Sequence, residues 1–267
     1  MKKTAPQFNG FALCLHLCAG SVLLFVIAPL AGMLWHSQLS EINTTVQDVT
    51  VQRSILLTLA TSLGATAVFS LPAIPFAYLL ARRVFPLKRL VLGIVDLPVV
   101  IPHSAVGIAL LTVLNRNSVA GQVAGKLGLS FVGSSLGIGV AMAYVSLPFL
   151  INAAREGFAA VPLQYEKAAL TLGASPVRVF FTIALPLATR SIVTGFVMMF
   201  SRGLSEFGAI VIIAYYPMVT PVLIYQRFND FGLTYARGVS VVFIFVCLVV
   251  FVVLRMISGR EGPHVAD

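Results

Sequence analysis

The sequence predicts an all-α membrane protein, and its composition and the length of its apolar stretches are the observations that indicate this class. The chain has 267 residues, of which 58% are hydrophobic and only 10% are charged. This is far too apolar for an ordinary soluble domain. A helix needs about 20 predominantly apolar residues to cross the hydrocarbon core of a bilayer, and such stretches recur along nearly the whole chain. We therefore predict one transmembrane domain, residues 1–267, with about six helices.

The first apolar stretch is predicted to be an uncleaved membrane anchor. It runs from Phe11 to Trp35, after Lys2 and Lys3 and before a polar loop. A secretory signal peptide is the alternative interpretation. The apolar core of such a peptide has about 7–15 residues, and this stretch is much longer, which favours the anchor.

Five further apolar stretches follow, numbered here from the second to the sixth. The second stops at Arg82 and Arg83, and the third contains Pro98 and Pro102, which membrane helices tolerate where neighbours satisfy the freed carbonyls. The fourth is short but within reach of a span. The predicted spans are Ile55–Leu80, Leu90–Leu114, Leu136–Ile151, Leu187–Gly208 and Val239–Leu254.

Lys and Arg placement predicts that both termini face the cytoplasm, because cytoplasmic loops carry an excess of these residues. If the N-terminus is inside, twelve lie on inner segments and five on outer loops, with Arg202 embedded. The net charge of +9 is then mainly an orientation signal. The cations are scattered over short loops, so a nucleic-acid partner is not expected.

Neither a disulfide framework nor a metal site is predicted. Cys14, Cys18 and Cys247 all fall in predicted spans. Cys14 and Cys18 share a helix face with too few further ligands for a metal, so we expect them to pack. The four His residues are scattered and form no catalytic cluster with a nucleophile or a carboxylate pair: His16, His36, His103 and His264.

An inner loop of about 30 residues, 152–182, carries signals for two short helices. Pro162 suits the first turn of a helix over Leu163–Leu172, and Gly173 can supply the left-handed residue that ends it. Ser175 then caps a second helix that starts at Pro176. An amphipathic helix resting on lipid is the alternative. Only Lys167 is cationic from 162 to 177, so we interpret the loop as a docking surface for a partner.

The spacing within this loop resembles the signature of ABC importer permeases. The matching residues are Glu166, Ala168, Ala169, Gly173, Ile183, Leu185 and Pro186. In the commonest form of the signature Glu directly precedes the two Ala, whereas here Lys167 intervenes. The resemblance extends over nearly all six spans.

This resemblance implies a type I importer fold in a bacterial or archaeal cytoplasmic membrane. Two permease copies would form a homodimer, two cytoplasmic ATP-binding subunits would each receive one coupling helix, and an extracytoplasmic protein would deliver the substrate. The expected docking residues are Glu166, Ala168, Ala169, Gly173, Ala174, Ser175 and Pro176. The chain has no GxxxxGK[ST] loop, so no cofactor is expected in it, and ATP and Mg would be bound by the partner subunits.

Ionisable residues in the fifth span suggest a translocation pathway, because charges at membrane depth are costly and usually face a bundle interior. Arg202 and Glu206 are four residues apart and can pair, with Ser201 and Ser205 beside them. A pair that only neutralises itself and pins helices is the alternative. Hydroxyls and backbone donors would let an oxyanion pass without trapping it.

His103 and Ser104 are further pathway candidates, since they follow two prolines where a broken helix would expose backbone groups. A packed, hydrogen-bonded His is the alternative. Asp96 lies nearer the inner half, and it would either pair with a basic residue such as Arg89 or face water.

The stretch that begins at Glu206, EFGAIVIIAYYPMVTPVLIYQRF, resembles permeases for molybdate and tungstate, with sulfate permeases close behind. This resemblance implies an oxyanion cargo selected mainly by the external protein. A secondary transporter and a membrane enzyme are the competing classes. The chain shows no convincing internal repeat of the kind secondary transporters have, and a secondary transporter would leave the docking loop unexplained.

Overall fold

The computed structural model describes residues 10–258, and within this range every regular element is a helix. Lys2, Lys3 and Arg260, which contributed to the orientation argument, lie outside the described residues. The elements are α1 (Gly10–Trp35), α2 (Leu39–Gln47), α3 (Val49–Arg82), α4 (Lys88–Val100), α5 (His103–Leu114), α6 (Val119–Lys126), α7 (Ser135–Ala160), α8 (Leu163–Thr171), α9 (Pro176–Val179), the π-helical turn η1 (Phe180–Ala184), α10 (Leu185–Leu204), α11 (Ile210–Ile213), α12 (Thr220–Phe231) and α13 (Leu233–Ser258).

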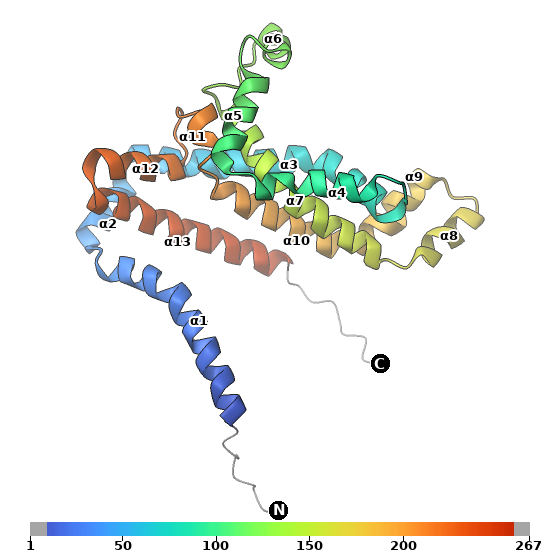
Figure 1. The fold of residues 1–267 in the computed structure, drawn as a ribbon, viewed down its shortest axis with the longest axis horizontal. Helices are drawn as coiled ribbons and strands as arrows, with labels where there is room; N and C mark the ends of the chain where they lie inside the picture. The colour runs from blue at the N-terminus through green and yellow to red at the C-terminus, as the bar shows by residue number, and fades with distance from the viewer. Residues whose placement is uncertain (1–9, 259–267) are drawn as a thin grey trace, which may run out of the picture.

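The count of about six membrane-crossing helices is confirmed. Five helices are long and apolar enough to span a membrane, and a bent pair, α4 and α5, makes a sixth if it crosses as one unit. Figure 1 shows α8 and α9 at one end of the bundle and α2 and α12 at the other.

The inner segment is shorter than the predicted 152–182, because both flanking helices extend into it. α7 continues to Ala160, and α9, η1 and α10 form one helical rod from Pro176 to Leu204. Residues 152–160 read NAAREGFAA, which are mostly good helix formers although they are no longer uniformly apolar. We placed the ends of the predicted spans where the sequence becomes less apolar, and the helices continue beyond those points.

The third span is not a straight helix. The helix axis bends by 110° between α4 and α5, and Figure 1 shows α5 and α6 standing out from the side of the bundle. Ile101 between them is extended, with φ −72° and ψ 138°, as expected for a residue that precedes proline. Pro102 offers no N–H to continue the helix. The helix is thus broken before His103, as expected there, and α4 and α5 together remain a candidate span.

The core of the bundle is formed by α3, α7 and α10, whose buried large residues include Leu80, Leu150, Phe158 and Met199. Close approach of α10 to α7 requires Gly195, because a Cβ there would lie 2.9 Å from Cβ of Ala153. Small residues at such crossings let helix backbones pack tightly in membranes.

Buried hydroxyls on α3 fasten it to two other helices. Thr58 Oγ1 accepts a hydrogen bond of 2.8 Å from the backbone N–H of Thr220, at the start of α12. Ser62 Oγ donates to the carbonyl of Phe200 in α10 at 2.8 Å. These two bonds, one helical turn apart on α3, join it to the start of α12 and to the C-terminal part of α10.

Two ion pairs hold α2 and the residue after it to the α12–α13 hairpin: Arg237–Glu41 at 3.2 Å and Arg227–Asp48, between α2 and α3, at 2.7 Å. Burial alone would raise the pKa of Asp48, but hydrogen bonds from Thr50 and Arg227 outweigh it, so this pKa is lowered. The carboxylate thus stays charged at neutral pH.

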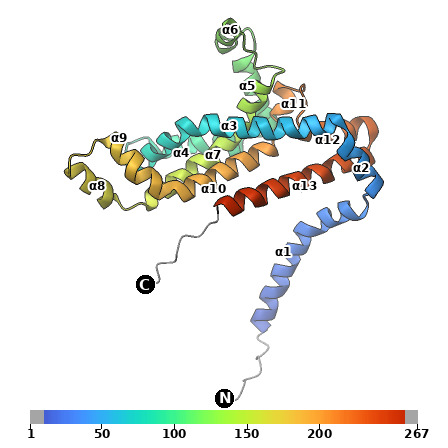
Figure 2. The ribbon, with the colours of Figure 1, turned by 180° about the vertical axis from the view of Figure 1, so that it is seen from behind.

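α1 diverges from the rest of the bundle in both views (Figures 1 and 2). None of its residues is buried. Cys14 and Cys18 are exposed, so the packing that we expected for them is not found within this chain. These cysteines are exposed because α1 diverges from the bundle, so that other helices do not cover its side chains. No group of three or more His, Cys, Asp or Glu residues suited to a metal occurs in residues 10–258.

Candidate functional site

The α8–α9 loop has nearly the local structure that its sequence predicts. Pro162 lies one position earlier than expected, as the N-cap of α8 with φ −60° and ψ 126°. Gly173 has φ +86°, which confirms the left-handed residue at the end of the helix. Ser175 Oγ accepts a hydrogen bond of 3.3 Å from the N–H of Arg178, and Pro176 occupies the first turn of α9.

The loop exposes a small-residue surface. Gly173 has open space around it, since a Cβ there would meet nothing within 4 Å. Of the predicted docking residues, Ala168, Gly173, Ser175 and Pro176 are exposed, Ala169 and Ala174 are half-buried, and Glu166 is buried. A partner placed against the loop would therefore meet these small residues together with the larger exposed side chains of Tyr165, Leu170 and Leu172.

Glu166 is turned inward, away from this surface. Its Oε2 accepts a hydrogen bond of 2.7 Å from Tyr78, and its Oε1 accepts bonds of 2.8 and 2.6 Å from Nε and Nη2 of Arg82. The expectation that Glu166 is among the docking residues is corrected, because these α3 donors occupy the carboxylate and the residue is buried. Arg82 entered the sequence argument only as an orientation charge. This ion pair could have been suspected from the sequence, because Arg82 and Glu166 carry opposite charges and were both expected on the inner side.

The pathway candidates meet where α4 breaks and α10 ends. Glu206, fully buried, lies with Oε2 at 2.9 Å from Nδ1 of His103 and 3.3 Å from Nη2 of Arg202. Oε2 has no hydrogen-bond partner within residues 10–258, so its contact with Arg202 is an ion pair, and the His103 ring lies against the same oxygen. The predicted pairing of Arg202 with Glu206 is confirmed, and His103 joins it as a third member.

Glu206 also shapes the backbone beyond α10. Its Oε1 accepts a hydrogen bond of 3.0 Å from the N–H of Ala209, just before α11. Gly208 is required beside the cluster, because a Cβ there would lie 2.7 Å from Cβ of His103. One carboxylate thus fixes the α4–α5 break, the end of α10 and the start of α11.

The outer side of this cluster is polar and accessible. The side chains of Arg202 and His103 are 25% and 31% exposed, whereas that of Glu206 is 0% exposed. Arg202 Nη1 donates to Ser205 Oγ at 3.2 Å. Ser205 and Ser104 are exposed and Ser201 is half-buried. The surface therefore presents cationic and hydroxyl groups, with the negative charge behind them.

Asp96 has a neutral partner, which neither alternative for it had included. Its Oδ1 accepts a hydrogen bond of 2.6 Å from the side-chain amide of Asn152 in α7. Both residues line a cavity of about 380 Å³ together with Glu156 and Met198.

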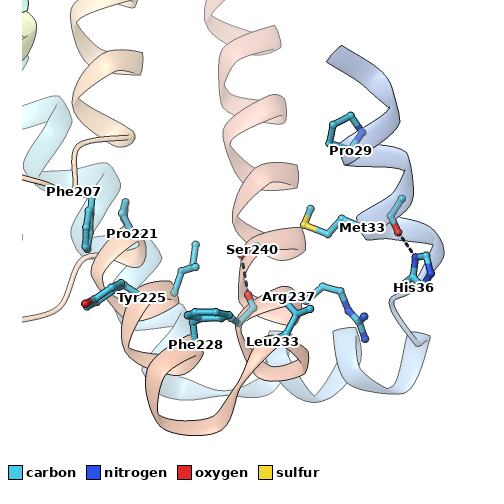
Figure 3. Close-up of a pocket in the computed structure, with 13 residues that line it drawn as sticks. Pro29, Met33, His36, Phe207, Pro221, Tyr225, Phe228, Leu233, Arg237 and Ser240 are labelled. Atoms are coloured by element: carbon cyan, nitrogen blue, oxygen red, sulfur yellow. Dashed lines mark hydrogen bonds between the residues drawn. The ribbon is translucent and has the colours of Figure 1, made fainter. Parts of the chain in front are cut away.

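A cavity of about 780 Å³ lies between α1 and the α12–α13 hairpin (Figure 3). Its wall is mostly apolar, with Pro29, Met33, Phe228 and Leu233 among the residues that line it. Nδ1 of His36 forms a hydrogen bond of 2.8 Å with the carbonyl of Gly32. None of the pathway candidates lines this cavity, and its chemistry suits hydrocarbon rather than an oxyanion.

Comparisons with known proteins agree with this architecture. Residues 73–260 match the family model described as binding-protein-dependent transport system inner membrane component. The molybdate/tungstate transport system permease protein WtpB of Thermococcus kodakarensis is 39% identical over 257 residues, which are 95% of this chain and 99% of that protein. The probable sulfate transport system permease protein cysT of Chlorokybus atmophyticus is 32% identical over 214 residues, covering 79% of this chain and 75% of that protein.

A similar fold is found in the crystal structure of a bacterial alginate ABC transporter in complex with an alginate pentasaccharide-bound periplasmic protein. The matched chain has a TM-score of 0.72 at 18% sequence identity, with 94% of each chain covered.

Proposed function

The chain belongs to the binding-protein-dependent transport system inner membrane components, and from this membership we propose that it is the permease subunit of an ATP-driven ABC importer for molybdate or tungstate. Similarity to a molybdate/tungstate permease over 95% of the chain is the observation that carries the choice of cargo. The sulfate permease relative makes sulfate the alternative cargo.

ATP hydrolysis would be performed by two separate subunits that bind ATP and Mg on the cytoplasmic side. The exposed residues of α8 and the turn after it, small at Ala168 and Gly173 and apolar at Leu172, support this arrangement, because an exposed apolar patch marks a contact with another protein. A second permease copy would complete the pathway, and α1, none of whose residues is buried, offers it a contact surface. The likeness to a transporter solved with its periplasmic protein supports an extracytoplasmic binding protein as the donor of cargo.

In this mechanism the ATP state of the partner subunits favours one arrangement of the bundle over the other, which gives alternating access. The oxyanion would pass Arg202, His103 and the adjacent serine hydroxyls. The buried carboxylate of Glu206 reduces the net positive charge there. A weakened site of this kind lets an anion enter and leave, as conduction requires.

The function is tested by purifying the chain with its partners and measuring import into proteoliposomes. We expect an ATPase subunit to co-purify in detergent, and uptake of tungstate or molybdate to need both ATP and the loaded external protein. Sulfate is supplied in parallel as the competing cargo. Uptake without ATP would contradict the importer assignment, and uptake of sulfate alone would contradict the proposed cargo.

The proposed orientation has both termini and the α8–α9 loop in the cytoplasm of a bacterial or archaeal cell. In a background without the native cysteines, Leu172→Cys, in the loop, and Val119→Cys, on α6, place thiols at side chains that are 88% and 81% exposed. With a membrane-impermeant reagent, we expect labelling of intact cells at position 119 only, and at position 172 after permeabilisation. The reverse pattern would overturn the orientation.

A further inference from the structure

Glu166 is the buried residue of α8, and the group that holds it belongs to α3. Besides its two contacts with Glu166, Arg82 Nη2 donates to the carbonyl of Val161 at 3.1 Å, just before α8. The side chains of Arg82 and Glu166 are 11% and 8% exposed. Bonds of this kind, between ionised groups shielded from water, are stronger than neutral ones.

Tyr78 extends this contact to both helices that flank the loop. Its ring centroid lies 5.2 Å from that of Phe158 in α7 and 5.0 Å from that of Phe180 in η1, both in edge-to-face geometry. Its hydroxyl meanwhile bonds Glu166. Tyr78, Arg82 and Glu166, which we term the α3 anchor, therefore gather α7, α8 and η1 onto one end of α3.

We propose that the α3 anchor is the joint through which movement of the docked α8 reaches the transmembrane bundle. This rests on the proposed function, in which an ATPase subunit moves α8. A nine-residue helix whose other residues are not buried would shift on its flanking turns without moving α3. The anchor removes that freedom, because its buried carboxylate cannot leave two α3 donors without a large penalty.

α3 leads from the anchor toward the candidate pathway. Figure 2 shows α3 running along most of the bundle, from the α8 end to the α12 end. Ser62 on this helix bonds the carbonyl of Phe200, two residues before Arg202. A displacement of α3 would therefore move the end of α10 through this hydrogen bond. Arg82 and Tyr78 act in this scheme as positioning residues.

The test compares variants that weaken the anchor while keeping its shape. Tyr78→Phe removes one hydrogen bond and retains the ring contacts, and Glu166→Gln removes the charge. Tyr235→Phe is the matched control, since this tyrosine is 58% exposed on α13. For each variant one measures membrane abundance, co-purification of the ATPase subunit, and oxyanion imported per ATP hydrolysed.

We expect Tyr78→Phe to keep normal abundance and normal co-purification, while import per ATP falls by about tenfold or more, as expected when a hydrogen bond to a charged group is lost. Arg82→Lys should retain more of this ratio than Arg82→Met. A purely structural anchor would lower abundance and uptake together at an unchanged import per ATP, which would overturn the proposal. Loss of co-purification in Glu166→Gln but not in Tyr78→Phe would also overturn it, because Glu166 would then contact the ATPase directly.

Failure of the proposed function itself gives a different result, because the unmodified chain would then neither co-purify an ATPase nor import in an ATP-dependent way. If the Arg82 variants do not accumulate, Tyr78→Phe still decides the question.

Discussion

Arg202→Met and Glu206→Gln are each expected to lower the amount of folded permease in the membrane, and the double variant is expected to recover part of that loss. Glu206 is fully buried and pairs with Arg202 and His103. Removing one partner of a buried pair leaves an uncompensated charge, at a cost of about 3–5 kcal/mol. Because a domain is stable by only about 5–15 kcal/mol, this cost is large. Removing both partners is milder, since neither charge remains alone.

Arg190→Met is the matched control, because Arg190 is an exposed arginine on the same helix, α10. The measurements are the abundance of folded permease after detergent extraction and the rate of oxyanion uptake per folded molecule. His103 adds a further comparison: His103→Gln should be milder than Arg202→Met, since the permanent charge of Arg202 stays beside Glu206. An Arg202→Met protein with normal abundance but no uptake would show that Arg202 acts on the cargo and does not serve as a structural pair.

Gly173→Asp is expected to leave the permease folded and abundant but to abolish uptake and weaken co-purification of the ATPase subunit. Gly173 has φ +86°, where an added side chain costs about 1–3 kcal/mol. A carboxylate there would also stand at the exposed surface proposed for docking. Buried without a partner at an interface, that charge would oppose association.

Two controls separate strain from docking in this experiment. Gly173→Asn carries a similar backbone strain without the charge, so it should retain more uptake. Gly128→Asp introduces the same change at a matched position: Gly128 has φ +71°, follows a short helix, and has nothing within 4 Å of its Cβ. It should import normally. Full uptake by Gly173→Asp would contradict the docking surface, and an equal defect in Gly128→Asp would assign the effect to strain.

Local signals in the sequence predicted the loop well, because each depends on neighbouring residues. Gly173 ends α8 in the left-handed conformation and Ser175 caps α9, as propensity and capping rules predict. The ends of α7 and α10 were misplaced because hydropathy reports where the bilayer is, while helices continue as long as the residues favour them. Pro102 marked an interruption of the third span, but the angle of 110° depends on packing.

Contacts between distant residues were the part that the sequence could not provide. Arg202 and Glu206 are four residues apart, so their pairing follows from helix geometry. His103 lies 99 residues from Arg202, and Arg82 lies 84 residues from Glu166. Asn152 was also missed as the partner of Asp96, because an amide at the edge of an apolar stretch carries no charge signal. Each of these contacts depends on how the helices are placed in three dimensions.

The π-helical turn η1 sets the angular phase between the two halves of the rod from Pro176 to Leu204. An α-helix advances about 100° per residue, and a π turn holds one residue more than an α turn would. If the residues of Phe180–Ala184 formed a plain α-helix, the extra residue would rotate α9 by about 100° around the rod axis, while α10 kept its buried face against α7. The five residues of η1 thus determine which side of α9 points away from the bundle.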